Sequence, residues 1–380
     1  MQRSILFAFS ALVHAYVGLR LCPALSAWAP APTLLAVWLA ASALLMPLAL
    51  LLRRMEGRRL GDALAWAGML LMGLFSTLFV LTVLRDAGLV AAALLTWLWP
   101  ALALRNLAAD SAALVPIAAL LVTLFGLVGA RRTAAVVRVD VPITGLPDAL
   151  HGFLIAQISD IHVGPTIKGP YVAAIVAAVN RLEAHMVAIT GDLVDGSVAQ
   201  LREHVAPLAG LSSRHGTFFV TGNHEYYSGA HAWIAELARL HVRVLLNEHV
   251  VLDHGQAALA VAGVTDFSAG HFDAAHASDP HAAIAGAPGH ATFRLLLAHQ
   301  PRSAAAAADA GFHLQLSGHT HGGQFLPWNF FVRLQQPFPA GLHRLRDLWV
   351  YTSRGTGYWG PPKRLGAPSE ITLLRLVPAA

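Results

Sequence analysis

Long apolar runs fill the first third of the chain, and only short ones occur after it. Five runs, at residues 4–21, 33–52, 62–84, 89–104 and 111–130, are each long enough, or nearly so, to cross about 30 Å of hydrocarbon as a helix. Charged residues or prolines separate them, and four arginines lie in the segment 53–59. The runs carry too few polar faces for helices of a water-soluble domain. Residues 1–130 are therefore predicted to form a transmembrane helical region of about five spans.

The pattern changes after residue 130. Residues 131–150 are predicted to be a linker, and residues 151–380 a second domain in which short apolar runs alternate with helical stretches. A helix is expected at 170–184, where a proline stands at the first turn and apolar residues follow at helical spacing. Strands are expected at 153–158, 186–190, 217–221, 259–264, 294–298 and 314–317. Strands that alternate with helices predict a layered α/β domain.

Composition supports a membrane protein and argues against nucleic-acid binding and against a site or crosslink made of several cysteines. Hydrophobic residues make up 56% of the chain, charged residues only 12%, and the sequence pI is 9.8. Residues 1–138 hold eleven arginines against four acidic residues, so the basic pI comes from segments between the apolar runs. No nucleic-acid partner is expected, because the second domain carries no basic excess. The single cysteine, Cys22, allows neither an intrachain disulfide nor a zinc site made of several thiolates.

Arginines also bear on the orientation of the chain in the cell (inner) membrane. The arginine-rich segment 53–59 is expected in the cytoplasm by the positive-inside rule. Counting five spans from it places the second domain outside, and we take this as the expectation. Arg131, Arg132 and Arg138 would then lie on the outer side, against the rule. If the fourth or fifth run does not cross, the domain is cytoplasmic instead.

Five short polar motifs follow the predicted strands in order. Each of the first three and the last comes directly after an apolar run, and the fourth ends one. They are Ser159-Asp160-Ile161-His162, Thr190-Gly191-Asp192, Thr221-Gly222-Asn223-His224-Glu225, Ala298-His299 and Ser317-Gly318-His319-Thr320-His321. Loops at the carboxyl ends of strands gather in one crevice of an α/β fold, so these residues are expected to converge. Two Asp, one Asn and four His can hold two divalent cations, an arrangement that suits hydrolysis of phosphate esters.

These motifs give the sequence a family resemblance. Over roughly residues 150–375 it resembles the calcineurin-like metallophosphoesterases, whose pattern is Asp-x-His, Gly-Asp, Gly-Asn-His-Asp/Glu, a lone His and Gly-His-x-His. The surroundings of the last motif, and Gly355-Thr356-Gly357-Tyr358-Trp359-Gly360, are similar to the membrane-associated bacterial branch of that family. The resemblance implies a four-layer α/β/β/α sandwich and two bound divalent metal ions, of Mn, Fe, Zn or a similar element.

The resemblance also implies a role for each motif residue. Asp160, His162 and His321 would bind the first metal. Asn223, His299 and His319 would bind the second, and Asp192 would bridge both. His224 would not bind metal but would stabilise the transition state or protonate the leaving oxygen, which suits an imidazole.

Several neighbouring residues keep two interpretations. Asp195 and Glu225 are either carboxylates that orient the ligands or ordinary turn and helix residues. Arg354, Tyr358, Trp359, Lys363 and Arg364 either contact a substrate or close the fold. The apolar segment 325–338 either contacts a lipid surface or packs on the sheet.

The predicted function is metal-dependent hydrolysis of a phosphomonoester, phosphodiester or pyrophosphate bond. The membrane region makes the lipid bilayer a partner and favours a lipid-linked or nucleotide-sugar substrate. A non-catalytic membrane scaffold that retains the phosphoesterase fold is the alternative, but none of the motif residues has been lost. A transporter with a soluble appendage is a third class, and the apolar runs lack the paired ionisable residues that transport sites use.

Overall fold

The computed structural model describes residues 2–51, 59–100 and 106–379, and the chain divides into two compact units. The first contains residues 1–128 with 360–363, and the second contains the rest. Each unit is described on its own below.

Four helices of the first unit are long and apolar enough to cross a membrane. They are α1 (Gln2–Leu21), α2 (Ala31–Leu51), α3 (Arg59–Leu98) and α4 (Leu107–Arg131). A short 3-10 turn, η1 (Pro23–Leu25), follows α1. Val17, Leu39 and Phe75 belong to the apolar core that these helices share. The predicted transmembrane region is thus helical, as expected.

The predicted break at residues 85–88 does not exist, because α3 continues through it for 40 residues. Its two charged residues have partners inside the unit. Arg85 donates to Ser111 Oγ and to the carbonyl of Ala108, and Asp86 accepts from Arg20 and Tyr16. The runs 62–84 and 89–104 therefore belong largely to one helix, and four spans replace five among the described residues. Residues 52–58 and 101–105, which include most of the arginine-rich segment and the end of the run 89–104, lie outside the described part of the chain.

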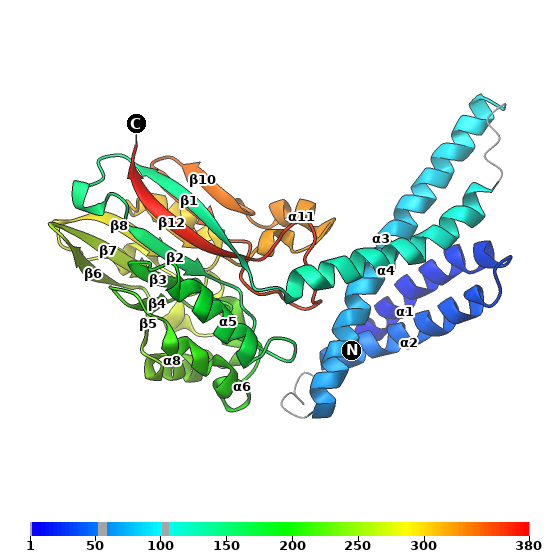
Figure 1. Cartoon of the computed structure of the whole chain (residues 1–380), viewed down its shortest axis with the longest axis horizontal. Coiled ribbons are helices and arrows are strands. Elements are labelled where there is room, and N and C mark those ends of the chain that lie inside the picture. Colours follow the sequence, from blue (N-terminus) through cyan, green and yellow to red (C-terminus); the bar gives the residue numbers. More distant parts are fainter. Residues whose placement is uncertain (1, 52–58, 101–105, 380) are drawn as a thin grey trace. The chain divides into compact units, whose positions relative to one another are not determined.

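Two six-stranded mixed sheets form the centre of the second unit (Figure 1). The first has the order β1-β12-β2-β3-β4-β5 and the second β10-β11-β9-β8-β7-β6. In the first sheet the strands are β1 (Ala135–Ile143), β12 (Glu370–Pro378), β2 (Leu154–Ile158), β3 (Met186–Ile189), β4 (Thr217–Phe219) and β5 (Val242–Val244). In the second they are β10 (Gly341–Leu345), β11 (Leu348–Thr352), β9 (Leu314–Ser317), β8 (Ala291–Leu297), β7 (Ala257–Gly263) and β6 (Glu248–His254). β2 to β5 are parallel to one another, and so are β11, β9, β8 and β7.

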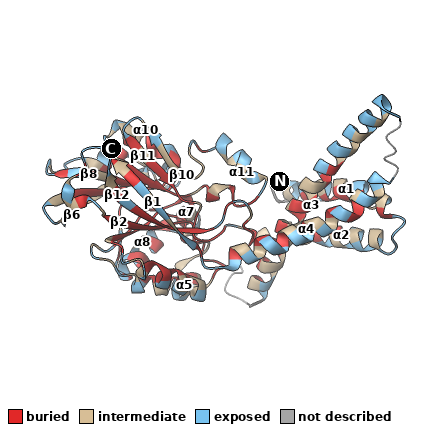
Figure 2. Ribbon diagram, turned by 45° about the horizontal axis from the view of Figure 1, so that its top comes forward, coloured by how far each residue is buried: buried red, intermediate tan, exposed pale blue. Residues whose placement is uncertain are grey.

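Helices cover the outer face of each sheet, which gives the predicted four layers. Alternate strand residues face opposite ways: Ile155 lies in the core between the sheets, whereas Ala156 faces the helices. α5 (Gly169–Asn180), α6 (Val198–Val205) and α8 (Ala230–Arg239) pack on the first sheet. α9 (Pro280–Ile284) and α10 (Ala304–Asp309) pack on the second. Figure 2 shows the strands mostly in the buried colour and the helices with one exposed face.

The expected linker 131–150 is part of the domain. Residues 135–143 form β1, which pairs in parallel with β12 along its whole length, from Ala135 opposite Glu370 to Ile143 opposite Pro378. η3 (Asp148–Leu150) then leads into β2. The alternation of Val137, Val139 and Val141 with polar residues is typical of a strand, and pairing with the last strand of the chain fixes it there. Only three residues separate α4 from β1.

Candidate metal centre

Five strands deliver the motif residues to one place, as the sequence predicted. β2, β3 and β4 of the first sheet end just before Asp160, Asp192 and Asn223, and β8 and β9 of the second end just before His299 and His319. α7 (Asn223–Ser228) starts at Asn223 itself, and η8 (His321–Gly323) starts at His321. The backbone N–H groups of Asp160 and His162 donate to the carbonyls of Gly191 and Asp192, so the first two loops run side by side.

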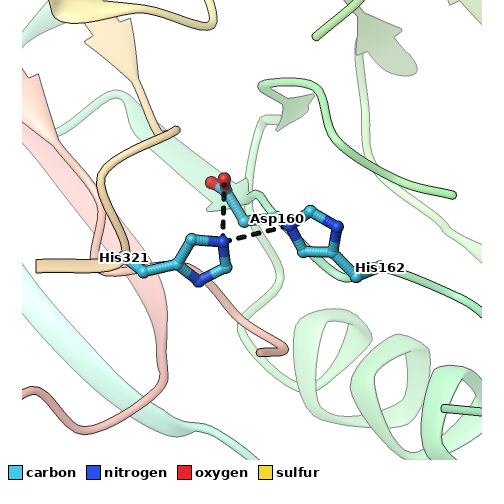
Figure 3. A group of neighbouring side chains, drawn as sticks. All are labelled: Asp160, His162 and His321. Atoms are coloured by element: carbon cyan, nitrogen blue, oxygen red, sulfur yellow. Dashed lines mark hydrogen bonds and ion pairs between the residues drawn. The ribbon is translucent and has the colours of Figure 1, made fainter. Parts of the chain in front are cut away.

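The side chains form two main groups, and a third group, of His162, Asp192 and His224, connects them. Asp160, His162 and His321 are one group, drawn in Figure 3, and Asp192, His299 and His319 are the other. In the first, His162 Nε2 lies 3.0 Å from His321 Nε2, which lies 3.5 Å from Asp160 Oδ1. In the second, His299 Nε2 lies 3.2 Å from Asp192 Oδ2 and 3.2 Å from His319 Nδ1.

One oxygen of Asp192 lies between the two groups. Asp192 Oδ2 is 3.2 Å from His299 Nε2 and 3.9 Å from the Nε2 atoms of both His162 and His224. Its other oxygen accepts a hydrogen bond from the backbone N–H of His224. The carboxylate is therefore fixed by one oxygen, and the other is directed toward both groups.

Five of the motif residues have a left-handed backbone conformation that side chains other than glycine rarely adopt. They are Asp160 (φ 53°), His162 (φ 55°), Asp192 (φ 50°), His319 (φ 69°) and His321 (φ 51°). Each such residue costs on the order of 1 kcal/mol and persists only where the surrounding structure imposes it. Strain that gathers at one cluster of polar side chains is typical of a functional site.

Glycines let these loops come together. A Cβ atom added to Gly222 would collide with the Asp192 carboxylate and backbone, and one added to Gly318 would collide with Ser159 and Asp160. No side chain fits at either position.

One buried oxygen of the motif residues has no hydrogen-bond partner in the described part of the chain and so is free to hold a cation. Asn223 Oδ1 is buried and has no hydrogen-bond partner among the described residues. A buried carbonyl oxygen normally has a hydrogen-bond partner. We therefore expect a bound cation to take the place of that partner. The Nδ1–H of His299 donates to the carbonyl of Thr190 at 2.7 Å, so Nε2, which lies 3.2 Å from Asp192 Oδ2, is the nitrogen that would exchange its proton for a metal. Carbonyl, carboxylate and imidazole donors together fit a divalent transition metal.

The first group fits a cation in exchange for a proton. Asp195 accepts from His162 Nδ1 at 3.1 Å, and Arg364 donates to His321 Nδ1 at 3.0 Å. With its proton on Nδ1, His162 has a bare Nε2, whereas His321 accepts at Nδ1 and keeps its proton on Nε2. A single proton therefore lies between the two facing Nε2 atoms. Metal binding to imidazole displaces such protons, so this group fits a metal that is bound with proton release.

Burial and charge set the protonation of the centre. Burial raises the pKa of Asp160, and the nearby charge of Asp192 adds to the rise. Burial would also raise the pKa of Asp192, but His299 and His224 outweigh it and hold that pKa well below its usual range. Burial lowers the pKa of His319 to about 3, and burial with Arg364 lowers the pKa of His321 well below its usual range. Both rings are neutral at pH 7, which is the form that binds metals.

His224 lies at the edge of the centre and differs from the other histidines. Its Nδ1–H donates to Asp195 Oδ1 at 2.5 Å. Burial would lower its pKa, but the carboxylates of Asp192 and Asp195 outweigh burial and raise the pKa to about 9. At pH 7 the ring is therefore a cation with a proton at Nε2.

Asp195 and Glu225, for which the sequence left two interpretations, both contact residues of the centre. Asp195 accepts from the rings of His162 and His224. Glu225 is fully buried, and its oxygens accept from the backbone N–H groups of Asp192, Leu193, Val194 and Gly222. Asp195 thus orients two rings, and Glu225 joins the second and third loops. Burial and the charge of Asp192 raise the pKa of Glu225 to about 8.

The residues near the C-terminus have different positions. Arg364 is buried and donates to the carbonyls of His321, Arg354, Gly357 and Ala367 as well as to the His321 ring, so it closes the fold and holds a motif residue. Arg354 pairs with Glu370. Trp359 is half exposed, and its ring centroid lies 5.9 Å from that of His224. The contact between Arg364 and His321, 43 residues apart, has no sequence signal.

A further group of His231, Asp273 and His276 lies away from the motif residues and is more exposed. His231 Nε2 lies 3.0 Å from Asp273 Oδ2, and His276 Nδ1 lies 2.8 Å from the hydroxyl of Tyr226. No motif in the sequence predicted that these three residues would lie together.

Comparison with known proteins places this centre in a family. The model of the calcineurin-like phosphoesterases matches residues 153–323. The chain is 43% identical over 281 residues to a transmembrane protein with metallophosphoesterase domain from Bos taurus, covering 70% of this chain and 63% of that protein. It is 37% identical to an uncharacterized metallophosphoesterase of Campylobacter jejuni, covering 65% and 64%. The chain thus spans somewhat under two thirds of the length of these two relatives.

A shorter relative is matched over most of its length. The chain is 31% identical over 224 residues to an uncharacterized metallophosphoesterase of Aquifex aeolicus, covering 58% of this chain and 84% of that protein. The matched family region contains all eight motif residues discussed above. The chain belongs to the calcineurin-like metallophosphoesterase family.

Proposed function

We propose that the chain is a two-metal phosphoesterase that hydrolyses a phosphomonoester, phosphodiester or pyrophosphate bond. The observation that carries the proposal is the position of Asp192 Oδ2 between two groups of buried imidazoles and a second carboxylate. When bound, two divalent cations supply positive charge for the phosphoryl oxygens and lower the pKa of a water molecule. Mn, Fe and Zn all suit the donor set.

Each motif residue has a proposed part in holding the cations. Asp160, His162 and His321 would hold the first and Asn223, His299 and His319 the second, with Asp192 shared. Asp195 and Arg364 keep the rings of His162 and His321 in place, since each contacts the Nδ1 atom of its ring. Glu225 holds the backbone of the Asp192 loop against that of Gly222.

His224 is proposed to be the proton donor. Its Nδ1 is occupied by Asp195, so the proton at Nε2 is the one available to a leaving oxygen. The pKa of about 9 keeps this proton on the ring at pH 7 and still allows its transfer to a strongly basic alkoxide. A non-catalytic scaffold would not need to retain the strained backbone and all eight motif residues of this centre.

The test measures turnover and bound metal together. We expect the purified full chain with Mn²⁺ to hydrolyse bis-p-nitrophenyl phosphate. His224→Ala should retain its metal and lower kcat on an alkyl phosphoester by about 10² to 10⁴, the usual contribution of a general acid, with a smaller loss on bis-p-nitrophenyl phosphate, whose leaving group is only weakly basic. His281→Ala, which removes an exposed imidazole, is the matched control and should behave as the wild type. Absence of turnover with any divalent metal would refute the proposal, and metal loss in His224→Ala would show that His224 is a ligand.

The first unit is proposed to make the protein a multi-pass component of the inner membrane, related to the membrane-associated bacterial branch of the family. Four apolar helices of sufficient length support this, and so does the Bos taurus relative, which is itself named a transmembrane protein.

A further inference from the structure

A segment beside the metal centre presents large apolar side chains to solvent. Residues 324–339, which we name the apolar platform, contain α11 (Trp328–Phe331) and η9 (Val332–Leu334), and neither helix buries a residue. Figure 2 shows α11 in the exposed colour. The exposed side chains are Leu326 (44%), Trp328 (42%), Phe330 (67%), Phe331 (53%) and Leu334 (82%). Of the two interpretations of this segment, packing on the sheet is therefore wrong for these side chains.

The platform is exposed although its backbone is firmly held. The Gln324 N–H donates to the carbonyl of His321, and the Thr320 hydroxyl donates to the carbonyl of Pro339, so both ends are bonded to the loop that carries His319 and His321. A Cβ atom added to Gly323 would collide with Asn329, so α11 lies directly on that loop.

The loop that carries His299 holds the platform from another direction. Arg302 donates through Nε and Nη2 to the carbonyl of Gln335, at 2.8 and 2.6 Å, and Gln336 donates to the side chain of Gln300. The backbone of the platform is therefore held in place by hydrogen bonds to two loops of the metal centre. Apolar side chains on an anchored backbone that face water indicate an interaction surface.

The chemistry of the platform suits the surface of a bilayer. It combines Trp and Phe, which favour the headgroup level of membranes, with an exposed Arg333. No Asp or Glu occurs between Asp309 and Asp347 in the sequence, so no carboxylate of that stretch opposes an anionic lipid headgroup.

The bilayer is also the apolar phase to which the second unit is tethered. Three residues join the end of α4 to the start of β1, and extended residues span at most about 3.6 Å each. A domain tethered this closely to an apolar helix experiences a high effective concentration of membrane. A soluble partner protein would have to compete with it.

A short series of contacts connects the platform to the metal centre. Gln324, the first platform residue, exchanges two hydrogen bonds with the backbone of Trp359, at 2.9 and 2.8 Å. The half-exposed ring of Trp359 in turn lies beside His224. The ring of Trp359 could therefore contact the acyl chain of a leaving group next to His224.

We propose that the apolar platform docks into the interfacial layer of the bilayer and that the metal centre acts on phosphoesters carried by membrane lipids. Docking stands on the platform alone, whereas the substrate class rests on the function proposed above. The two parts are therefore tested separately.

Docking is tested with spin labels on the full chain in vesicles of phosphatidylcholine and phosphatidylglycerol. In a Cys22→Ser background, Phe330→Cys and Leu334→Cys place a nitroxide on the platform, and Ala282→Cys places one on the exposed side of α9 as the matched control. We expect the platform labels to collide more with lipid-dissolved oxygen than with an aqueous nickel chelate, and the control label to show the reverse. Equal access of the chelate to all three labels would overturn docking. Spin–spin broadening between platform labels would also overturn it, because the occupant would then be a second copy of the chain.

The substrate class is tested with the variant Phe330→Ser, Leu334→Ser. Turnover of phosphatidic acid in vesicles should fall at least about tenfold, and turnover of soluble bis-p-nitrophenyl phosphate should not change. Equal loss on both substrates, or a wild type that cleaves only the soluble ester, would overturn the lipid-substrate part. A wild type inactive on both would refute the proposed function and leave the spin-label result standing.

Discussion

At the scale of single residues, the centre is an arrangement of charges that the chain cannot balance alone. Asp160 and Asp192 are both buried, and burial of like charges raises the pKa of Asp160. The imidazoles nearest to them are fixed by contacts on their far nitrogens, such as His299 to the carbonyl of Thr190. Two divalent cations would satisfy the carboxylates, the free imidazole nitrogens and Asn223 Oδ1 together.

Asp192→Asn tests the shared carboxylate. The amide retains the shape but loses the charge that faces both groups, so we expect turnover to disappear and at least one metal to be lost. Circular dichroism should show that the fold remains, and elemental analysis gives the metal content. Asp253→Asn, at an exposed carboxylate on β6, is the control and should match the wild type. Full activity of Asp192→Asn would contradict the shared role.

Asp195→Asn tests a residue that acts through its neighbours. Asp195 orients His162 and His224, and loss of such a partner typically costs about 10- to 100-fold in metal affinity or activity. Isothermal titration with Mn²⁺ should show weaker binding, and kcat should fall with little change in KM. Restoration of both quantities by Asp195→Glu would support an orienting carboxylate, whereas an unchanged Mn²⁺ affinity would argue for a turn residue.

Residue identity predicted the members of the centre but not the contacts of their neighbours. Asp160, Asp192 and His299 were expected together because each follows or ends an apolar run, and the structure places each of them in a group of possible metal ligands. Glu225 had two interpretations because the backbone N–H groups that donate to it, those of Asp192 and Leu193, lie more than 30 residues away in the chain. Such a contact depends on how two loops approach each other, which local sequence does not encode.

At the scale of elements, strands that end at the centre were predictable and strands at the sheet edges were not. Continuous apolar runs identified β2, β3, β8 and β9, because buried parallel strands are apolar on both faces. β1 was assigned to a linker because its partner, β12, lies at the other end of the chain. Likewise, nothing near Arg85 shows that Ser111 and Ala108 will bind it and let α3 continue.

Gly357→Ala tests how tightly the last segment of the chain packs on the first motif loop. An added Cβ would collide with the backbone carbonyl of Ile161, between Asp160 and His162, and backbone cannot move aside easily. We expect a loss of about 1–3 kcal/mol in stability, seen as a lower midpoint of thermal unfolding of the domain. Gly289→Ala is the matched control, because its added Cβ would meet no atom within 4 Å. Equal midpoints for the two variants would show that the segment yields without cost.

At the scale of the whole molecule, the number of helices decides the side of the membrane on which the domain lies. The outward location depended on five crossings, and α3 replaces two of the predicted spans by one helix. A 40-residue helix is about 60 Å long, twice the hydrocarbon thickness, so it crosses once and extends beyond. With four crossings the arginine-rich segment 53–59 and Arg131, Arg132 and Arg138 lie on the same side, and the positive-inside rule is satisfied at every position that opposed it before.

We therefore predict a cytoplasmic domain. A C-terminal alkaline phosphatase fusion should be inactive and a C-terminal green fluorescent protein fusion bright, because the first folds only outside the cytoplasm and the second only within it. Fusions after Leu98, at the far end of α3, should give the opposite pair of results and serve as the internal control. An active C-terminal phosphatase would overturn the cytoplasmic location, and together with an inactive fusion after Leu98 it would mean that the four crossings run the opposite way, against the positive-inside rule. The test thus decides both the orientation of the domain and the leaflet whose lipid phosphoesters the metal centre can reach.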